Sequence, residues 1–149
     1  MLITIVGCQS DAKAVPKAKM FCIKVDIPKD LKDDKVFDVS SSLSNNSNSS
    51  WKLEHGADMF TYEVYDTKGK LVHQDVKERF VDSIGYVTTL KPKGLYSYDE
   101  GEHVSPKYNE LLLKKGSYEV ISKAKFRINK DGKEFDFEIK SKPFRLNVY

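Results

Sequence analysis

Polar and hydrophobic residues alternate most clearly along the stretch from Tyr118 to Ile128. Every second position there is apolar or small, and the positions between them are charged except at Ile121. A period of two over this length predicts a β-strand with one buried side and one side facing solvent. The side expected to be buried carries Tyr118, Val120, Ser122, Ala124, Phe126 and Ile128.

Two further amphipathic strands are expected to follow this one. Asn129 to Gly132 predicts a hairpin turn, because Asp131-Gly132 suits the positive φ angles of a tight hairpin. Three successive strands with one apolar face each require a second sheet to cover that face, so the pattern predicts a β-sandwich. The apolar positions of the two later strands, which are separated by Pro143, are Phe135, Phe137, Ile139, Phe144, Leu146 and Val148.

The rest of the chain shows short extended segments separated by turn-forming residues. About nine strands at this spacing predict an all-β fold, an immunoglobulin-like antiparallel β-sandwich. The connections include polar loops at 44–50 and 99–107 and turns at 66–69 and 91–94. The strands expected before Tyr118 cover residues 21–27, 36–43, 51–54, 60–65, 71–76, 86–90 and 95–98.

Composition and charge describe an ordinary globular protein. The 149 residues include 25 basic and 22 acidic side chains, so the formal net charge is +3. This excess is too small to argue for a nucleic-acid partner, and most lysines alternate with core positions as solvent-facing residues. No apolar run approaches the ~20 residues that a membrane-spanning helix needs. The length fits one domain that can bury a core without metal or disulfide.

A short motif near the start of the chain indicates where in the cell the protein is located. An apolar run ends in Ile5-Val6-Gly7-Cys8 and polar residues follow at once. This resembles a bacterial lipobox, in which aliphatic and small residues precede a cysteine that becomes the lipidated N-terminus. The resemblance implies lipidation at Cys8, with residues 1–19 as a truncated signal remnant and tether and 20–149 as the sandwich domain. The alternatives are an N-terminal strand with an ordinary thiol, or a disulfide between Cys8 and Cys22.

A second resemblance covers most of the chain from Val36 to Val148. Leu43 to Val72 contains an L-x-N-x-S hairpin, a break with glycine, and an aromatic strand ending in Y-D-x-x-G-K; a Lys-Pro turn follows at 91–94. A later L-x-x-G-x-Y-x-V segment includes Tyr118. These features resemble the BsuPI-type family, named for the intracellular proteinase inhibitor of Bacillus. The resemblance implies an immunoglobulin-like domain and, through the family name, inhibition of a serine proteinase; Tyr118 is interpreted as a tyrosine corner.

Signatures of catalysis and cofactor binding are missing from the sequence. No Gly-x-Ser-x-Gly elbow, GxGxxG or Walker pattern occurs, so we expect neither an enzyme nor a cofactor. The three histidines are scattered and no cysteine lies near them, so no metal site is expected. The densest group of possible ligands lies in the loop at 99–103, but its spacing does not match an EF-hand. A solvated acidic loop is the preferred interpretation.

Tyrosines flank this acidic loop. Tyrosine is common at protein-recognition surfaces, since it offers apolar area and a hydroxyl at low entropic cost. The competing interpretation is that individual tyrosines are core or edge residues. The candidate partner-binding residues are Tyr96, Tyr98, Asp99, Glu100, Glu102, His103 and Tyr108.

The resulting hypothesis is a lipid-anchored, extracytoplasmic protein-binding module of the cell envelope. Its loops at 56–58 and 99–108 would contact a protein partner, and a lipid at Cys8 would anchor the module in the membrane. One alternative is a proteinase inhibitor of the BsuPI type that inserts residues 96–108 into a proteinase cleft. Another is a structural envelope lipoprotein without a saturable partner. An unlipidated chain would favour a cytoplasmic inhibitor.

Overall fold

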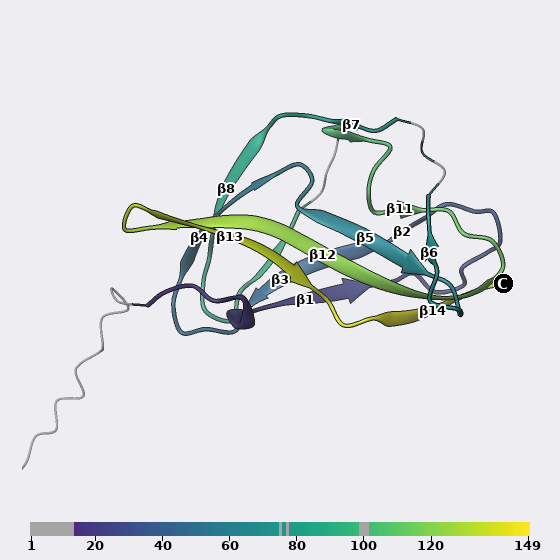
Figure 1. Ribbon diagram of the computed structural model, residues 1–149, viewed down its shortest axis with the longest axis horizontal. Coiled ribbons are helices and arrows are strands. Elements are labelled where there is room, and N and C mark those ends of the chain that lie inside the picture. Colours follow the sequence, from purple (N-terminus) through teal and green to yellow (C-terminus); the bar gives the residue numbers. More distant parts are fainter. Residues whose placement is uncertain (1–13, 75, 77, 99–101) are drawn as a thin grey trace, which may run out of the picture.

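The computed structural model describes residues 14–149 except 75, 77 and 99–101. In this part of the chain the regular elements are strands, apart from one short 3-10 helix, η2 (Ala18–Met20). All the strand pairs described below are antiparallel. Figure 1 shows β12, β13 and β5 in front of β1 and β3. The predicted all-β, immunoglobulin-like sandwich is therefore confirmed.

The longest strand, β12 (Gly116–Lys130), is the centre of a seven-stranded sheet. Along one edge it pairs with β14 (Phe144–Val148) and then with β13 (Lys133–Lys140). Along the other edge it pairs with β5 (Phe60–Tyr65) and then with β4 (Trp51–Gly56). Farther out, β6 (Leu71–Val72) pairs with β5, and β8 (Gly85–Leu90) pairs with β4.

The second layer is a three-stranded sheet with the order β1–β3–β9. Its strands are β1 (Phe21–Asp26), β3 (Ser40–Asn45) and β9 (Leu95–Ser97). Two short pairs complete the structure: β2 (Phe37–Asp38) with β11 (Glu110–Leu111), and β7 (Phe80–Val81) with β10 (Val104–Ser105).

The core lies where the predicted apolar face of β12 meets the smaller sheet. Val120, Ser122, Ala124, Phe126 and Ile128 are all buried, which confirms the alternation seen in the sequence. The buried residues form two apolar clusters, separated along β12 by Ser122. Its hydroxyl lies 2.9 Å from that of Ser41 on β3, so a polar contact joins the sheets between the clusters. Such a buried contact is tolerated because both hydroxyls are hydrogen-bonded.

Turn chemistry places the strands as expected. Asp131 and Gly132, with φ angles of 52° and 77°, join β12 to β13. In the turn between β5 and β6, the Asp66 carboxylate accepts the backbone N–H groups of Lys68 and Lys70, both at 2.9 Å. The Tyr118 hydroxyl donates to the Lys114 carbonyl at 2.8 Å, which confirms the tyrosine-corner interpretation.

Three segments differ from the prediction by more than the one or two residues at a strand end. The strand expected at 36–43 is divided at Val39, whose N–H donates to the Asn109 carbonyl instead of to a neighbouring strand of the main sheets. The strand expected at 71–76 is limited to β6. The expected loop at 99–107 contains β10, because Val104 is buried and pairs with β7. Local polarity predicted a loop at 99–107, but the burial and strand pairing of Val104 outweighed it.

The segment 14–20, most of which was expected to be a tether, lies against the sandwich. Pro16 is buried, and the Lys130 ammonium group at the β12–β13 hairpin donates to the Ala14 carbonyl. The Cys22 thiol is exposed on the polar face of β1, as the alternation predicted. Cys8 lies outside the described residues, and so do the lipidation and the disulfide considered for it.

Asn45, which was expected to lie in a solvated loop, is fully buried at the end of β3. Its amide nitrogen donates to the carbonyls of Ser49 at 2.7 Å and Leu90 at 3.0 Å. Its side-chain oxygen accepts the N–H of Ser47 at 3.0 Å and the Ser47 hydroxyl at 2.6 Å. Its backbone also pairs with Gly94 and Lys93. Asn45 thus joins the β3–β4 loop to the turn between β8 and β9.

We expect Asn45→Ala to lower the free energy of unfolding by about 3 kcal/mol, because the buried Ser49 and Leu90 carbonyls lose the hydrogen bonds of the Asn45 amide and the loop loses its contact to Ser47. Denaturant titration of both proteins measures this difference. The matched control is Asn48→Ala in the same loop, where the asparagine is exposed; its effect should stay within ~0.5 kcal/mol. Equal losses in the two variants would contradict the assigned role.

Candidate binding surface

The described members of the predicted surface separate into two groups. Tyr96 lies on β9 and Tyr98 follows it, and both rings are half-buried against His55. His103 joins this group through the ring of Tyr86, at a centroid distance of 6.1 Å. Glu102 is exposed. Asp99 and Glu100 lie outside the described residues.

Tyr108 forms the second group with Arg79. The Arg79 guanidinium lies 4.2 Å from the centre of the Tyr108 ring, a cation–π distance, and it also donates to the Pro106 carbonyl. These contacts fix the segment after β10 to the segment before β7. Tyr108 is thus held by its contact with Arg79 and is not part of the group formed by Tyr96 and Tyr98.

His55 is the centre of the first group, although the sequence did not single it out. It faces inward from β4 and is 6% exposed. Its ring stacks on Tyr86 with centroids 5.2 Å apart and an interplanar angle of 16°. Tyr98 meets the ring edge-on at 4.9 Å. We call His55, Tyr86, Tyr96 and Tyr98 the aromatic cluster; it joins β4 and β8 of the larger sheet to β9 of the smaller one.

The hydrogen bonds of His55 fix its neutral tautomer. Nδ1 donates to the Gly56 carbonyl at 2.8 Å, since a carbonyl can only accept. Nε2 therefore accepts from the Tyr96 hydroxyl at 2.7 Å. Burial lowers the pKa of His55 below its ordinary value of 6.5, and the Gly56 carbonyl and the Asp58 carboxylate offset this only in part. Burial also raises the pKa of Tyr96, so its hydroxyl remains a donor.

The aromatic cluster and the β7–β10 pair hold the two flanks of residues 99–101. On one side Tyr98 packs in the cluster. On the other side His103 Nδ1 lies 3.1 Å from the Asp82 carboxylate, and Val104 is 2% exposed. The acidic segment, by which we mean residues 99–102, is therefore flanked on both sides by packed residues.

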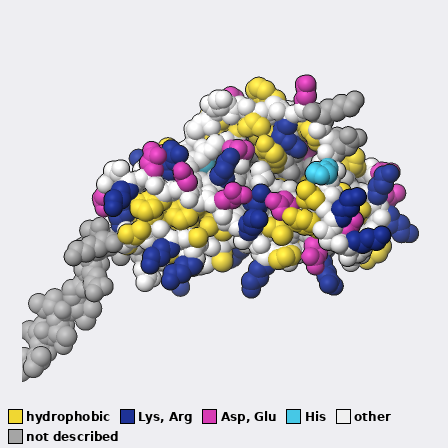
Figure 2. Space-filling model, viewed as in Figure 1, with side chains coloured by type: hydrophobic (Ala, Val, Ile, Leu, Met, Phe, Trp, Pro, Cys, Tyr) yellow, Lys and Arg dark blue, Asp and Glu magenta, His cyan; other side chains and the backbone are white. Residues whose placement is uncertain are grey.

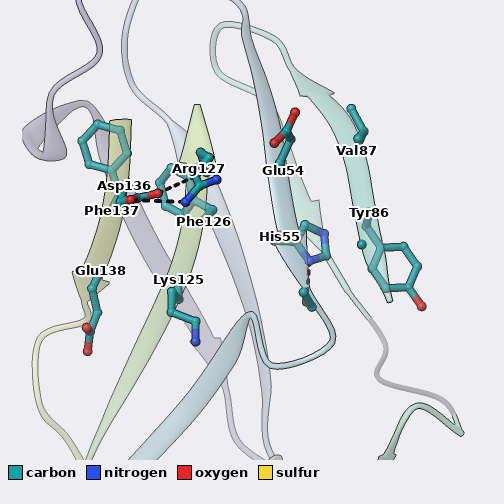
Figure 3. A pocket seen from close by; sticks show the side chains of 12 residues that line it. Glu54, His55, Tyr86, Val87, Lys125, Phe126, Arg127, Asp136, Phe137 and Glu138 are labelled. Atoms are coloured by element: carbon teal, nitrogen blue, oxygen red, sulfur yellow. Dashed lines mark hydrogen bonds and ion pairs between the residues drawn. The ribbon is translucent and has the colours of Figure 1, made fainter. Parts of the chain in front are cut away.

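A groove of about 900 Å³ lies on the larger sheet, across β13, β12, β4 and β8. Figure 3 shows these four strands side by side, with Asp136 and Arg127 in contact. The Arg127 Nε atom lies 2.7 Å from an Asp136 oxygen, and the Lys125 ammonium lies 2.7 Å from the Asp58 carboxylate. In Figure 2, basic and acidic side chains are interspersed over the visible face. This surface is charged but largely self-neutralised.

The described residues hold no obvious chemical centre. No group of three or more His, Cys, Asp or Glu side chains is arranged there to hold a metal ion. The Nε2 atom of His55 bonds a tyrosine hydroxyl, so this base does not face a serine or cysteine nucleophile. No described helix has the length and apolarity to cross a membrane. The arrangement suits recognition, through aromatic and charged side chains on a rigid support.

Sequence reasoning missed His55 and Tyr86 because alternation identifies a face but not the neighbours on it. The available signal was the inward position of His55 in the pattern Trp51, Leu53, His55. A polar ring at an inward position needs hydrogen-bond partners, and nearby tyrosines are suitable ones. The pairing of His55 with Tyr86 follows only from the register of β4 on β8.

Comparisons with known proteins find resemblance at the level of shape alone. No protein-family model matches the chain and no curated protein matches it. The Northeast Structural Genomics Consortium target SoR45 has a TM-score of 0.49 and 17% identity, over 87% of this chain and 88% of that one. AggA, the major subunit of aggregative adherence fimbriae type I from Escherichia coli, has a TM-score of 0.41 and 11% identity, over 87% and 94%. A PapD-like domain of human CEP192 has a TM-score of 0.33 and 12% identity, over 87% of this chain and 89% of that one.

At these identities and TM-scores the similarities carry no argument about function. The fold class rests on the strand pairing itself. The resemblance to the BsuPI-type family and the lipobox at Cys8 remain predictions.

We expect the protein to lose stability as the pH falls from about 7 through 6.5, in part because of His55. The unfolded chain protonates this side chain at its ordinary pKa, whereas the folded protein does so only at lower pH, so acid favours unfolding. The loss should level off below the folded pKa. Denaturant titrations at pH 7.5 and 5.5 measure it.

The pH-dependent loss should be smaller in His55→Gln, which keeps polar atoms but does not titrate. His73→Gln is the matched control, because it makes the same replacement at an exposed histidine. A pH dependence identical in His55→Gln and the unaltered protein would refute the assignment.

Proposed function

We propose that the protein is a non-enzymatic, protein-binding module of the bacterial cell envelope, anchored by a lipid at Cys8. The observation that supports binding is the fixing of both flanks of the acidic segment. Tyr98 packs against His55 at 4.9 Å on one side, and His103 pairs with Asp82 at 3.1 Å on the other. Binding residues concentrate on segments that a rigid scaffold positions, because little order remains to be acquired on binding.

The proposed surface consists of the aromatic cluster's exposed edges together with the acidic segment beside it. Tyr96 and Tyr98 are half-buried, so each is fixed by packing while part of it stays accessible. Glu102 adds an exposed carboxylate. Such a combination of rigid aromatic rings and charge suits a protein partner with a basic or polar patch.

The proposed anchor gives the module an orientation. Ala14 lies at the β12–β13 hairpin through its bond from Lys130. Figure 1 shows the C-terminus, β14 and β6 at the opposite end of the sandwich. A lipid at Cys8, only a few residues before Ala14, would place the hairpin end toward the membrane. The end that carries β14 and β6 would then face away from it.

Intact mass of the chain, expressed with its native upstream sequence in a bacterial host, tests the anchor. We expect a mass that corresponds to cleavage before Cys8 and addition of diacylglycerol. Cys8→Ser is the control and should lack the lipid. An unmodified chain starting at Met1 would contradict the anchor and favour a cytoplasmic protein.

Saturable binding of the labelled protein to isolated bacterial envelopes tests the surface. We expect replacement of Asp99, Glu100 and Glu102 by serine to weaken this binding about tenfold or more, since charge pairs at an interface each contribute more than 1 kcal/mol. The matched control replaces three carboxylates elsewhere, Asp26, Glu119 and Glu134, all of them exposed. It should bind as the unaltered protein does.

Two results, one from this experiment and one from a proteinase assay, would support other functions. Binding that does not saturate would favour a structural envelope lipoprotein. Inhibition of subtilisin-like proteinases at micromolar concentration would favour the inhibitor that the BsuPI resemblance implies, with residues 96–108 as the segment in contact with the proteinase.

A further inference from the structure

Two hollows flank β14 at the end of the sandwich opposite the β12–β13 hairpin (Figure 1). The larger, of about 540 Å³, lies between the β5–β6 turn and the neighbouring strands β12 and β14. The smaller, of about 250 Å³, lies between β14 and residues 27–31. Arg145 and Asn147 line both hollows, so the two adjoin at these residues.

The register of β14 on β12 brings the polar side chains of the larger hollow onto one surface. Ser117 pairs with Asn147, and Glu119 pairs with Arg145. Leu146, between the two β14 residues, is buried in the core, whereas all four paired residues are exposed. They therefore lie on the outer face of the larger sheet, beneath the β5–β6 turn.

Hydrogen bonds fix polar groups of the larger hollow and leave them with unused capacity. The Ser117 hydroxyl donates to Asn147 Oδ1 at 2.7 Å, so the Asn147 amide N–H groups remain available to a ligand. In the turn, Asp66 Oδ1 accepts two backbone N–H groups, and Oδ2 has no partner among the described residues. The Arg145 side chain is 88% exposed and meets the Glu119 carboxylate only loosely, at 3.8 Å.

The smaller hollow adds an aromatic surface. Tyr149 lines it and is 69% exposed. Its backbone is nevertheless fixed, because its N–H donates to the Leu31 carbonyl at 3.0 Å and its carbonyl accepts the Asp33 N–H at 2.9 Å. A ring on a fixed backbone offers apolar contact area at low entropic cost.

The basic surplus of the chain is concentrated at this end. Segments 27–35, 66–70, 114–119 and 142–149 together carry nine basic and five acidic side chains. Their surplus of four exceeds the surplus of three of the whole chain. Figure 2 shows basic side chains at the end that carries β14 and β6 in Figure 1. The summed charge therefore favours an anionic ligand here.

We propose that this end binds an acidic polysaccharide, with Arg145 and Asn147 between two successive sugar residues. One sugar occupies the larger hollow, where Asp66 accepts a hydroxyl and Asn147 donates to an oxygen. The next sugar packs its C–H face on Tyr149. Arg145 and the exposed lysines around the hollows pair with the anionic groups of the polymer.

The free oxygen of Asp66 selects a sugar over a simple anion. A ligand that is only an anion, such as phosphate, brings no donor for this carboxylate and is repelled by it. Sugar hydroxyls both donate and accept, as the mixed groups of the larger hollow require. An acidic polysaccharide satisfies the carboxylate in the hollow and the cations around it at the same time.

This inference goes beyond the proposed protein-binding function and concerns other elements of the fold. The acidic segment lies beside the aromatic cluster, whereas the sugar site consists of β14, the β5–β6 turn and residues 27–31. Serine replacements at Asp99, Glu100 and Glu102 should therefore leave saccharide binding unchanged. Failure to bind saccharide would leave the protein-binding proposal standing, so the two can fail separately.

A hexamer of galacturonic acid is the probe. Titrated into the full ¹⁵N-labelled chain, it should give saturable chemical-shift changes in the β5–β6 turn, in β14 and in residues 27–31. A neutral hexamer of glucose should bind about tenfold more weakly, because it lacks charge-assisted hydrogen bonds to Arg145. Polyphosphate of the same net charge should also bind about tenfold more weakly, because it lacks hydroxyl donors and a C–H face.

Two variants of the protein test the site itself. Arg145→Gln should weaken binding of the galacturonate hexamer about tenfold, whereas Lys24→Gln, which removes an exposed charge from β1, should bind normally. Tyr149→Ala should weaken the hexamer about threefold or more and leave polyphosphate binding unchanged, since only a sugar packs on the ring. Phe80→Ala, which removes a ring that is 61% exposed on β7, is its control.

Equal affinity for the galacturonate hexamer and polyphosphate would overturn the proposal, because this end would then be a simple cationic patch. Shift changes confined to other strands, or no saturation at millimolar hexamer, would overturn it too. The same holds for unchanged hexamer binding by both Arg145→Gln and Tyr149→Ala. Tighter binding of a single-stranded oligonucleotide than of the hexamer would assign this end to nucleic acid and exclude the polysaccharide.

Discussion

The structure depends on the pairing of β12 along both of its edges. Each edge carries two strands in succession, and β12 spans the breaks between them. At one break the Ser141 N–H donates to the Ser122 carbonyl at 2.8 Å, and the Ser141 hydroxyl accepts the Ser122 N–H at 2.9 Å. At the other, the Lys125 N–H donates to the Met59 carbonyl at 2.8 Å. Four strands are thus held in one sheet by a continuous backbone, and β8 takes its position from β4.

Different interactions join the two sheets at the two sides of the sandwich. On the side of β1 and β13, the rings of Phe21, Phe126 and Phe137 pack with centroids between 5.1 and 5.9 Å apart. On the side of β8 and β9, the His55–Tyr96 hydrogen bond joins the sheets within the aromatic cluster. A contact between phenylalanine rings is insensitive to pH, whereas the imidazole hydrogen bond is directional and its histidine titrates. The second side therefore fixes the position of β9 and of Tyr98, which follows it, more specifically.

The fold could be read from the sequence because β12 is strictly alternating and its hairpin has an Asp-Gly turn. Those signals are local, and the structure agrees with them to within a residue or two. Residues whose state depends on distant partners were predicted less well. Asn45 appeared to be a loop residue, yet its partners at Leu90 and Gly94 come from a turn far along the chain. The aromatic cluster and the groove likewise follow from register, which single-sequence alternation does not specify.

The two glycines of the groove differ in what the fold requires of them. A Cβ at Gly56 would lie 2.9 Å from an Asp58 carboxylate oxygen, and that carboxylate pairs with Lys125, so packing explains this glycine. Gly85 meets no such constraint, and its backbone is not in the left-handed region. Glycine in a strand costs about 0.5–1 kcal/mol relative to alanine. Since stability gains nothing from Gly85, the feature it supplies is space: with Gly56, its direct cross-strand neighbour, it leaves two adjacent positions of the groove without side chains.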